Sequence, residues 1–299
     1  MPPVRIGLIG AGTWGRTVLR ALYDTPGVAV TALASGRAES RELARPGCAF
    51  FSDWHELMVA SVADGVVVAT PPSSHVDIAL RAIAAGLATL VEKPLALSVA
   101  EAESLRDEAR ARSAIVHVNH IDLFNPLWRA LHRRLPRIGR VTTLAGAWAN
   151  CGPFRPDTPS RWDYGAHAVA VAIRAVGQEP TEVSGICRPG VGGGEMFEAR
   201  LGWPDGANAT LTFGNGSDSR QRRITVGGTL GEIVYDDVAR VATVNGAPVP
   251  HSRQTPLRAA IVRFARAIRC GQPDASDAAL GVEVVRTLSR LDRPAAQVR

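Results

Sequence analysis

A glycine-rich turn near the start of the chain constrains the fold more than any other sequence feature. Residues 4–9 form a short apolar run typical of a buried parallel strand, and residues 16–25 have the apolar spacing of a helix. Between them stands a complete G-x-G-x-x-G motif. Its glycines permit a tight turn, close approach of a pyrophosphate and close helix-strand packing. A bare glycine-rich turn is the alternative, but the strand before and the helix after it favour dinucleotide binding. The expected cofactor-binding residues are Gly10, Gly12, Thr13, Trp14 and Gly15.

Strands and helices continue to alternate as far as residue 120. This order predicts an α/β fold, a doubly wound parallel sheet in a dinucleotide-binding Rossmann domain over residues 1–120. The pattern then changes, and residues 181–249 alternate like antiparallel strands with glycine-containing turns. Two helices, at 256–269 and 274–291, close the chain. We therefore expect residues 121–299 to form a second, α+β domain that serves substrate binding and oligomerisation.

The end of the second expected strand bears on the choice of cofactor. An NAD-specific site normally has an acidic residue there, which accepts from the ribose 2′-hydroxyl. This chain has Ser35-Gly36-Arg37 instead, and Glu39 comes too late. A hydroxyl, free amides and a guanidinium suit a 2′-phosphate, so Ser35 and Arg37 favour NADP, with NAD still possible. The alternative is that Arg37 is a solvated side chain of the next helix.

The strand over residues 64–70 runs into a proline-rich turn. Thr70 and Pro71 stand at its carboxyl end, which is the ligand-binding edge of an open α/β sheet. His75 follows in the first turn of the next helix. The imidazole could contact a nicotinamide ribose, although a solvated histidine fits at least as well.

Lys93 is the only lysine among the 34 basic residues. A chain that uses arginine at every other such position keeps one compact ammonium, whose pKa burial can lower. Chance survival of a surface lysine is the alternative. However, Glu92 and Lys93 follow a short buried strand at 88–91, again at the ligand-binding edge. We therefore take Lys93 as the first candidate for chemistry.

Asp163 and His167 form the informative pair of the second domain. A spacing of four places both side chains on one face of a helix. The carboxylate can hold the imidazole tautomer, and Gly165 between them removes bulk where a ligand could approach. Taken alone, such a pair is more often a surface ion pair.

Together these motifs resemble the Gfo/Idh/MocA oxidoreductases. The resemblance rests on the G-x-G-x-x-G turn, residues 70–75 (TPPSSH), residues 92–94 (EKP) and residues 163–167 (DxGxH), in that order. It implies a Rossmann domain, then a domain with a large open, mainly antiparallel sheet whose free face makes a homodimer or homotetramer. It also implies NAD(P)-dependent oxidation or reduction of sugars, polyols or related carbonyl compounds. By resemblance, Lys93 contacts the substrate oxygen and nicotinamide ribose, His167 transfers the proton, and Asp163 lies beside it. The Lys93-Pro94 bond is often cis in this family.

Two departures from the common family pattern bear on the substrate. Many members have N-x-R-F where this chain has residues 119–124 (NHIDLF), and the loop at 151–157 also looks like the branch that acts on nucleotide-linked sugars. Both put inositol or free glucose in doubt, and His120 becomes a candidate substrate contact. Arg155 and Arg161 suggest an anionic or phosphorylated sugar, unless they are loop surface.

Composition excludes several other functions. The net charge of +6 could indicate nucleic-acid binding, but the arginines are scattered and aromatic residues make up only 5%. No apolar run approaches membrane-spanning length, so we expect no membrane partner. The four cysteines lie far apart without C-x-x-C spacing, which predicts free thiols, no metal and a cytoplasmic protein. A non-catalytic NADP sensor, or a hydrolase or lyase that oxidises its substrate transiently, remains as an alternative.

Overall fold

The computed structural model describes residues 2–155 and 158–291 of the chain. They divide into two compact units, which are described separately. Among the described residues, the first comprises 2–119 and Leu257–Val282, and the second comprises those of 120–256 and 283–291. Residues 257–282, which the sequence pattern places in the second domain, pack with the first unit. There the Val116 amide donates to the carbonyl oxygen of Asp274 at 2.8 Å.

The first unit contains a six-stranded parallel sheet in the order β3-β2-β1-β4-β5-β6. Every residue of β4, β5 and β6 is buried, as expected for central strands covered on both faces. The strand order reverses between β1 and β4, and ligands bind at such a switch point, beyond the carboxyl ends of the strands. The strands are β1 (Val4–Ile9), β2 (Val28–Ala34), β3 (Ala49–Phe51), β4 (Gly65–Val68), β5 (Ala88–Glu92) and β6 (Val116–Asn119).

Helices connect these parallel strands. The α3 helix packs against β4 and β5, and Ser98 caps α4 by accepting from the Glu101 amide at 3.2 Å. The α8 helix begins in the first unit and ends in the second. The helices with residues in this unit are α1 (Thr13–Tyr23), α2 (Trp54–Val59), α3 (His75–Ala84), α4 (Val99–Ala111), α7 (Pro256–Cys270) and α8 (Ser276–Arg290).

The second unit is built on a mixed, mainly antiparallel sheet of eight strands in the order β14-β13-β12-β11-β7-β10-β9-β8. Only the pairing of β10 with β7 is parallel. The α/β class and the two sheet types predicted from the sequence are thereby confirmed. The strands are β7 (Val141–Cys151), β8 (Glu182–Pro189), β9 (Glu195–Gly202), β10 (Asn208–Gly214), β11 (Gly216–Gly228), β12 (Gly231–Asp236), β13 (Val241–Val244) and β14 (Ala247–Pro248).

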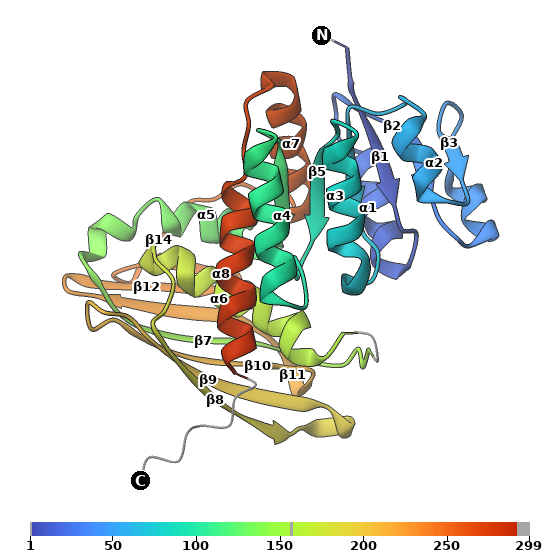
Figure 1. The fold of residues 1–299 in the computed structure, drawn as a ribbon. Helices are drawn as coiled ribbons and strands as arrows, with labels where there is room; N and C mark the ends of the chain where they lie inside the picture. Colours follow the sequence, from blue (N-terminus) through green and yellow to red (C-terminus); the bar gives the residue numbers. More distant parts are fainter. Residues whose placement is uncertain (1, 156–157, 292–299) are drawn as a thin grey trace. The chain divides into compact units, whose positions relative to one another are not determined.

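One face of this sheet is covered by helices. Helix α6 (Ser160–Val176) packs on β7 and β10, and α5 (Pro126–His132) packs on β12 and β13 (Figure 1). Along β7, Leu144 and Trp148 are buried while Thr143 and Ala145 are exposed, which is the alternation of a sheet with one covered face. Within residues 2–155 and 158–291, no helix is long and apolar enough to cross a membrane.

Candidate active site

The turn between β1 and α1 has the geometry that the three glycines require. Gly10 has a φ of +99°, and a Cβ there would lie 2.5 Å from the Ala69 carbonyl oxygen. A Cβ on Gly15 would lie 2.1 Å from the Gly10 carbonyl oxygen, so Gly15 is needed for helix-strand packing. A Cβ on Gly12 meets nothing within 4 Å. Gly12 also provides no side-chain cap for α1, which suits amide donors that bind an anion. The turn therefore fits a dinucleotide pyrophosphate.

The end of β2 presents a cation without a carboxylate. Arg37 is exposed, and its amide donates to the Ser35 hydroxyl oxygen at 3.2 Å. The same hydroxyl donates to Ser40 Oγ at 3.0 Å, so it is already engaged within the loop. The guanidinium of Arg37 is therefore the group at this strand end that suits a phosphate.

His75 is buried rather than solvated, with 1% of its surface exposed. Its Nδ1 lies 2.8 Å from the carbonyl oxygen of Pro94, and its Nε2 lies 2.9 Å from that of Thr70. Burial lowers the pKa of the ring, and the charge of Lys93 acts in the same direction. The imidazole thus links the turns after β4 and β5. Thr70 Oγ1 and the Pro71 carbonyl oxygen both accept from the Ser74 hydroxyl, which further orders the first of these turns.

Lys93 follows β5 directly and is half-buried, and the Lys93-Pro94 peptide bond is cis. The preceding residue, Glu92, is buried, and its Oε1 accepts from the Asn119 side-chain amide at 2.6 Å. Burial raises the pKa of the Glu92 carboxyl, while Trp14 and Asn119 oppose that shift. The first unit therefore brings Lys93, Glu92, Trp14 and His75 to one edge of the parallel sheet.

In the second unit, the carboxylate of Asp122 lies beside His167. Nδ1 of His167, on α6, lies 3.1 Å from Oδ2 of Asp122, which stands in the short helix η3 (Ile121–Phe124). Arg222 of β11 donates to Asp122 Oδ1 at 2.8 Å, and the Trp148 indole of β7 donates to Oδ2 at 2.8 Å. Burial by itself raises the pKa of Asp122, yet His167 and Arg222 hold it far below its usual range.

Asp122 lies within the NHIDLF segment, residues 119–124, and no motif in the sequence gives it a role. The expected partner, Asp163, has a side chain that is 14% exposed and lies 3.9 Å from the guanidinium of Arg155. Gly165 is also explained differently from the expectation. A Cβ at this position would lie 2.8 Å from the side chains of Leu288 and Phe213, so the glycine serves helix packing.

The remaining predicted contacts differ in exposure. His120 is buried at the start of the second unit, with 2% of its surface exposed. The Arg161 guanidinium lies over the Trp162 ring at 5.1 Å. Burial lowers the pKa of Arg161, and Glu195 opposes that shift. Arg161 is thus partly desolvated, whereas Arg155 is exposed.

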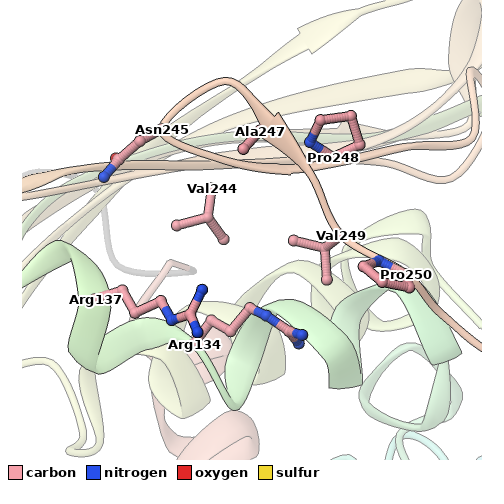
Figure 2. A pocket seen from close by; sticks show the side chains of 8 residues that line it. All are labelled: Arg134, Arg137, Val244, Asn245, Ala247, Pro248, Val249 and Pro250. Atoms are coloured by element: carbon pink, nitrogen blue, oxygen red, sulfur yellow. The ribbon is translucent and has the colours of Figure 1, made fainter.

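A cavity of about 250 Å³ lies elsewhere in the second unit and contains none of the predicted site residues. Two arginines face the β13–β14 hairpin across it (Figure 2). Its lining consists of Arg134, Arg137, Val244, Asn245, Ala247, Pro248, Val249 and Pro250.

The parallel sheet and its glycine turn define a dinucleotide-binding unit of the Rossmann type. Residues 4–120 match the Gfo/Idh/MocA family, described as an oxidoreductase family with an NAD-binding Rossmann fold. The chain is also 36% identical to a candidate oxidoreductase from Magnetospirillum magnetotacticum. That similarity covers 97% of this chain and 100% of the other, with a TM-score of 0.90. The chain belongs to the Gfo/Idh/MocA oxidoreductase family.

Other relatives have named activities of their own. Inositol 2-dehydrogenase 2 of Saccharopolyspora erythraea is 32% identical over 202 residues, which cover 62% of this chain and 60% of that protein. The alignment therefore spans less than two thirds of that relative. UDP-N-acetylglucosamine 3-dehydrogenase of Acidithiobacillus ferrooxidans shares the fold, with 24% identity, a TM-score of 0.85 and coverage of 97% of each chain.

Proposed function

We propose that this protein is an NADP(H)-dependent oxidoreductase that interconverts a hydroxyl and a carbonyl group on a sugar or sugar derivative. The observation that carries the proposal is Lys93, the one ammonium in an arginine-rich chain, at the ligand-binding edge of a dinucleotide-binding sheet. Family membership supports the reaction class. A bound nicotinamide supplies hydride acceptance or donation, and the protein supplies positioning and electrostatics.

Lys93 is proposed to bind the reacting oxygen of the substrate. A compact ammonium stabilises a developing alkoxide strongly where water is excluded, because the local dielectric is low. His75 supports this role because its ring contacts the carbonyl oxygen of Pro94, the residue after Lys93, and so helps to order that turn. Glu92 and Trp14 are proposed to line the cofactor site beside Lys93.

His167 is proposed to exchange the proton of that oxygen. Histidine suits the task because its ordinary pKa lies near working pH. Asp163, one turn earlier on the same helix, is proposed to contact the substrate.

The preference for NADP rests on Arg37. The end of β2 carries this exposed guanidinium and no acidic side chain, so a 2′-phosphate has a partner and a free 2′-hydroxyl has no carboxylate acceptor. We expect NADP(H) to bind more tightly than NAD(H), and Arg37→Asp to narrow or reverse the difference. Fluorescence titration of both cofactors tests this, and equal affinities in the unmodified protein would contradict it.

The proposed substrate class is an anionic sugar, either phosphorylated or nucleotide-linked. The exposed Arg155 and the partly desolvated Arg161 supply cations, and the NHIDLF segment resembles the nucleotide-sugar branch. A thermal-shift panel with NADP present should show larger stabilisation by sugar phosphates and nucleotide sugars than by neutral sugars. Stabilisation by neutral sugars alone would exclude this class.

We further propose a homodimer or homotetramer in the cytoplasm. The eight-stranded sheet exposes residues such as Thr143 and Ala145 on the face opposite α6, where a second copy can pack. The four cysteines are free, which fits a reducing compartment. Sedimentation equilibrium tests the assembly, and a monomer at all concentrations would contradict it.

A further inference from the structure

We propose that Asp122 is the positioning residue that fixes the tautomer of His167, so that Nε2 is the nitrogen that exchanges a proton with substrate. This inference rests on the proposed function of His167. Asp122 is 4% exposed, and its Oδ2 lies 3.1 Å from His167 Nδ1. A carboxylate only accepts hydrogen bonds, so this approach favours the tautomer with its hydrogen on Nδ1. The neutral ring then keeps its lone pair on Nε2.

Arg222 and Trp148 hold Asp122 as an ionised acceptor beside His167. Arg222 donates to Oδ1 at 2.8 Å, and Trp148 donates to Oδ2 at the same distance. Arg222 therefore compensates the buried negative charge, and its own pKa is raised because Asp122 outweighs the effect of burial. The phenol of Tyr235 and the carboxylate of Asp237 also lie close enough to interact with Arg222. The carboxylate is thus held as a hydrogen-bond acceptor on the side that faces His167.

Four elements of the second unit hold this cluster. Asp122 stands in η3, Trp148 and Arg222 on the adjacent strands β7 and β11, and His167 in the buried middle of α6. Arg222 and Trp148 pair directly in the β-ladder. Each donates to one oxygen of the carboxylate, and His167 approaches it from the helix. Such an arrangement orients an imidazole more precisely than a loop residue could.

The test is the tautomer of His167 in Asp122→Asn, read by nitrogen NMR of the ¹⁵N-histidine-labelled protein. Arg222 can only donate, so the new amide directs its oxygen to Arg222 and its NH₂ group to His167. Nδ1 must then accept, and the hydrogen moves to Nε2. We expect the ¹⁵N shift typical of a protonated nitrogen to move from Nδ1 to Nε2, and turnover to fall by on the order of 10²-fold or more. The His167 signal is assigned by its loss in His167→Asn.

Trp148→Phe is the matched control, because the amide at position 122 also deprives Trp148 of its acceptor. This variant removes that hydrogen bond but keeps the carboxylate against Nδ1. We expect the tautomer to remain and turnover to fall less than in Asp122→Asn. Inversion of the tautomer in both variants would show a general loosening of the cluster and overturn the proposal.

The unmodified protein provides a test that does not require a folded variant. A neutral His167 with its hydrogen on Nε2 would overturn the positioning role, whatever the activity. If Nδ1 carries the hydrogen, Asp122→Asn inverts it, and no sugar derivative is oxidised or reduced, the role of Asp122 stands and the proposed function fails.

Discussion

At the scale of single residues, Lys93 carries the chemistry proposed for this protein. Arginine would preserve the charge, but a planar guanidinium is larger and does not act as a point-like donor. We expect Lys93→Arg to lower turnover by about 10²- to 10³-fold, the usual effect of losing one stabiliser of developing negative charge. Steady-state kinetics measure the loss. Cofactor affinity should change far less, because the glycine turn and Arg37 are expected to set it. If folded Lys93→Arg keeps nearly the turnover of the unmodified protein, Lys93 has no chemical role in the reaction.

Combining Lys93→Arg with His167→Ala gives a further prediction. If both side chains act on one oxygen, each single change already removes most of the shared effect, so the double variant should lose less than the product of the single losses. Steady-state turnover of the four proteins measures this. Strictly multiplicative losses would indicate that the two residues act independently.

The residue scale is also where sequence reasoning and structure differ. Composition and spacing in the sequence point to Lys93 and His167 as candidates. Asp122 gave no such signal, because its pairing with His167 spans 45 positions and depends on how η3 meets α6. Its only trace was the unusual NHIDLF segment. Gly165 was interpreted as room for a ligand, although long-range packing against Phe213 and Leu288 explains it.

At the scale of elements, two glycines of the turn between β1 and α1 are expected to serve different purposes, Gly12 cofactor binding and Gly15 folding. Gly12→Ala introduces a methyl group into open space, whereas Gly15→Ala forces one to 2.1 Å from a carbonyl oxygen. We expect Gly12→Ala to keep its thermal stability and bind NADP(H) more weakly, because the methyl group stands where the pyrophosphate approaches. Gly15→Ala should lose stability outright. Thermal unfolding with and without cofactor measures both effects. Equal cofactor affinity in Gly12→Ala and the unmodified protein would contradict this role of the turn.

Element order was predictable where local signals are strong. Alternation in the first 120 residues identified five of the six parallel strands, but β3 has only three residues and gives no periodicity. The membership of α7 in the first unit was not predictable, because it depends on contacts such as that of Ile268 beside Gly65. Local pattern defines a helix without specifying the unit against which it packs.

At the scale of the whole molecule, buried histidines should make folding stability depend on pH. Burial lowers the pKa values of His75 and His117 in the folded protein. These two histidines therefore contribute fully to the free energy of unfolding above their unfolded-state pKa of about 6.5. This contribution is lost as the pH falls through their lowered folded-state pKa values. The pKa of Asp122 is also lowered in the folded protein, so its contribution to folding stability is lost at more acidic pH. Glu92 acts in the opposite direction, because its folded pKa is raised.

His117→Phe tests this dependence. The ring of His117 packs against Phe264 and its Nε2 lies 3.1 Å from Asp274, so phenylalanine fills the space without titrating. Denaturant unfolding between about pH 7 and pH 5 should show a free energy of unfolding that falls less steeply in this variant than in the unmodified protein. Identical slopes in His117→Phe and the unmodified protein would contradict the prediction.

The absorbance of reduced nicotinamide during turnover tests the proposed reaction most directly. Purified protein is mixed with NADP⁺ or NADPH and a panel of sugar phosphates and nucleotide-linked sugars, with their keto forms, while product is quantified in parallel. The proposal predicts a net absorbance change that matches the product formed, mole for mole. Product formed without a net change would indicate hydrolysis or elimination through transient oxidation, and bound cofactor with no product from any substrate would indicate a sensor. Either result would contradict an oxidoreductase with net cofactor turnover.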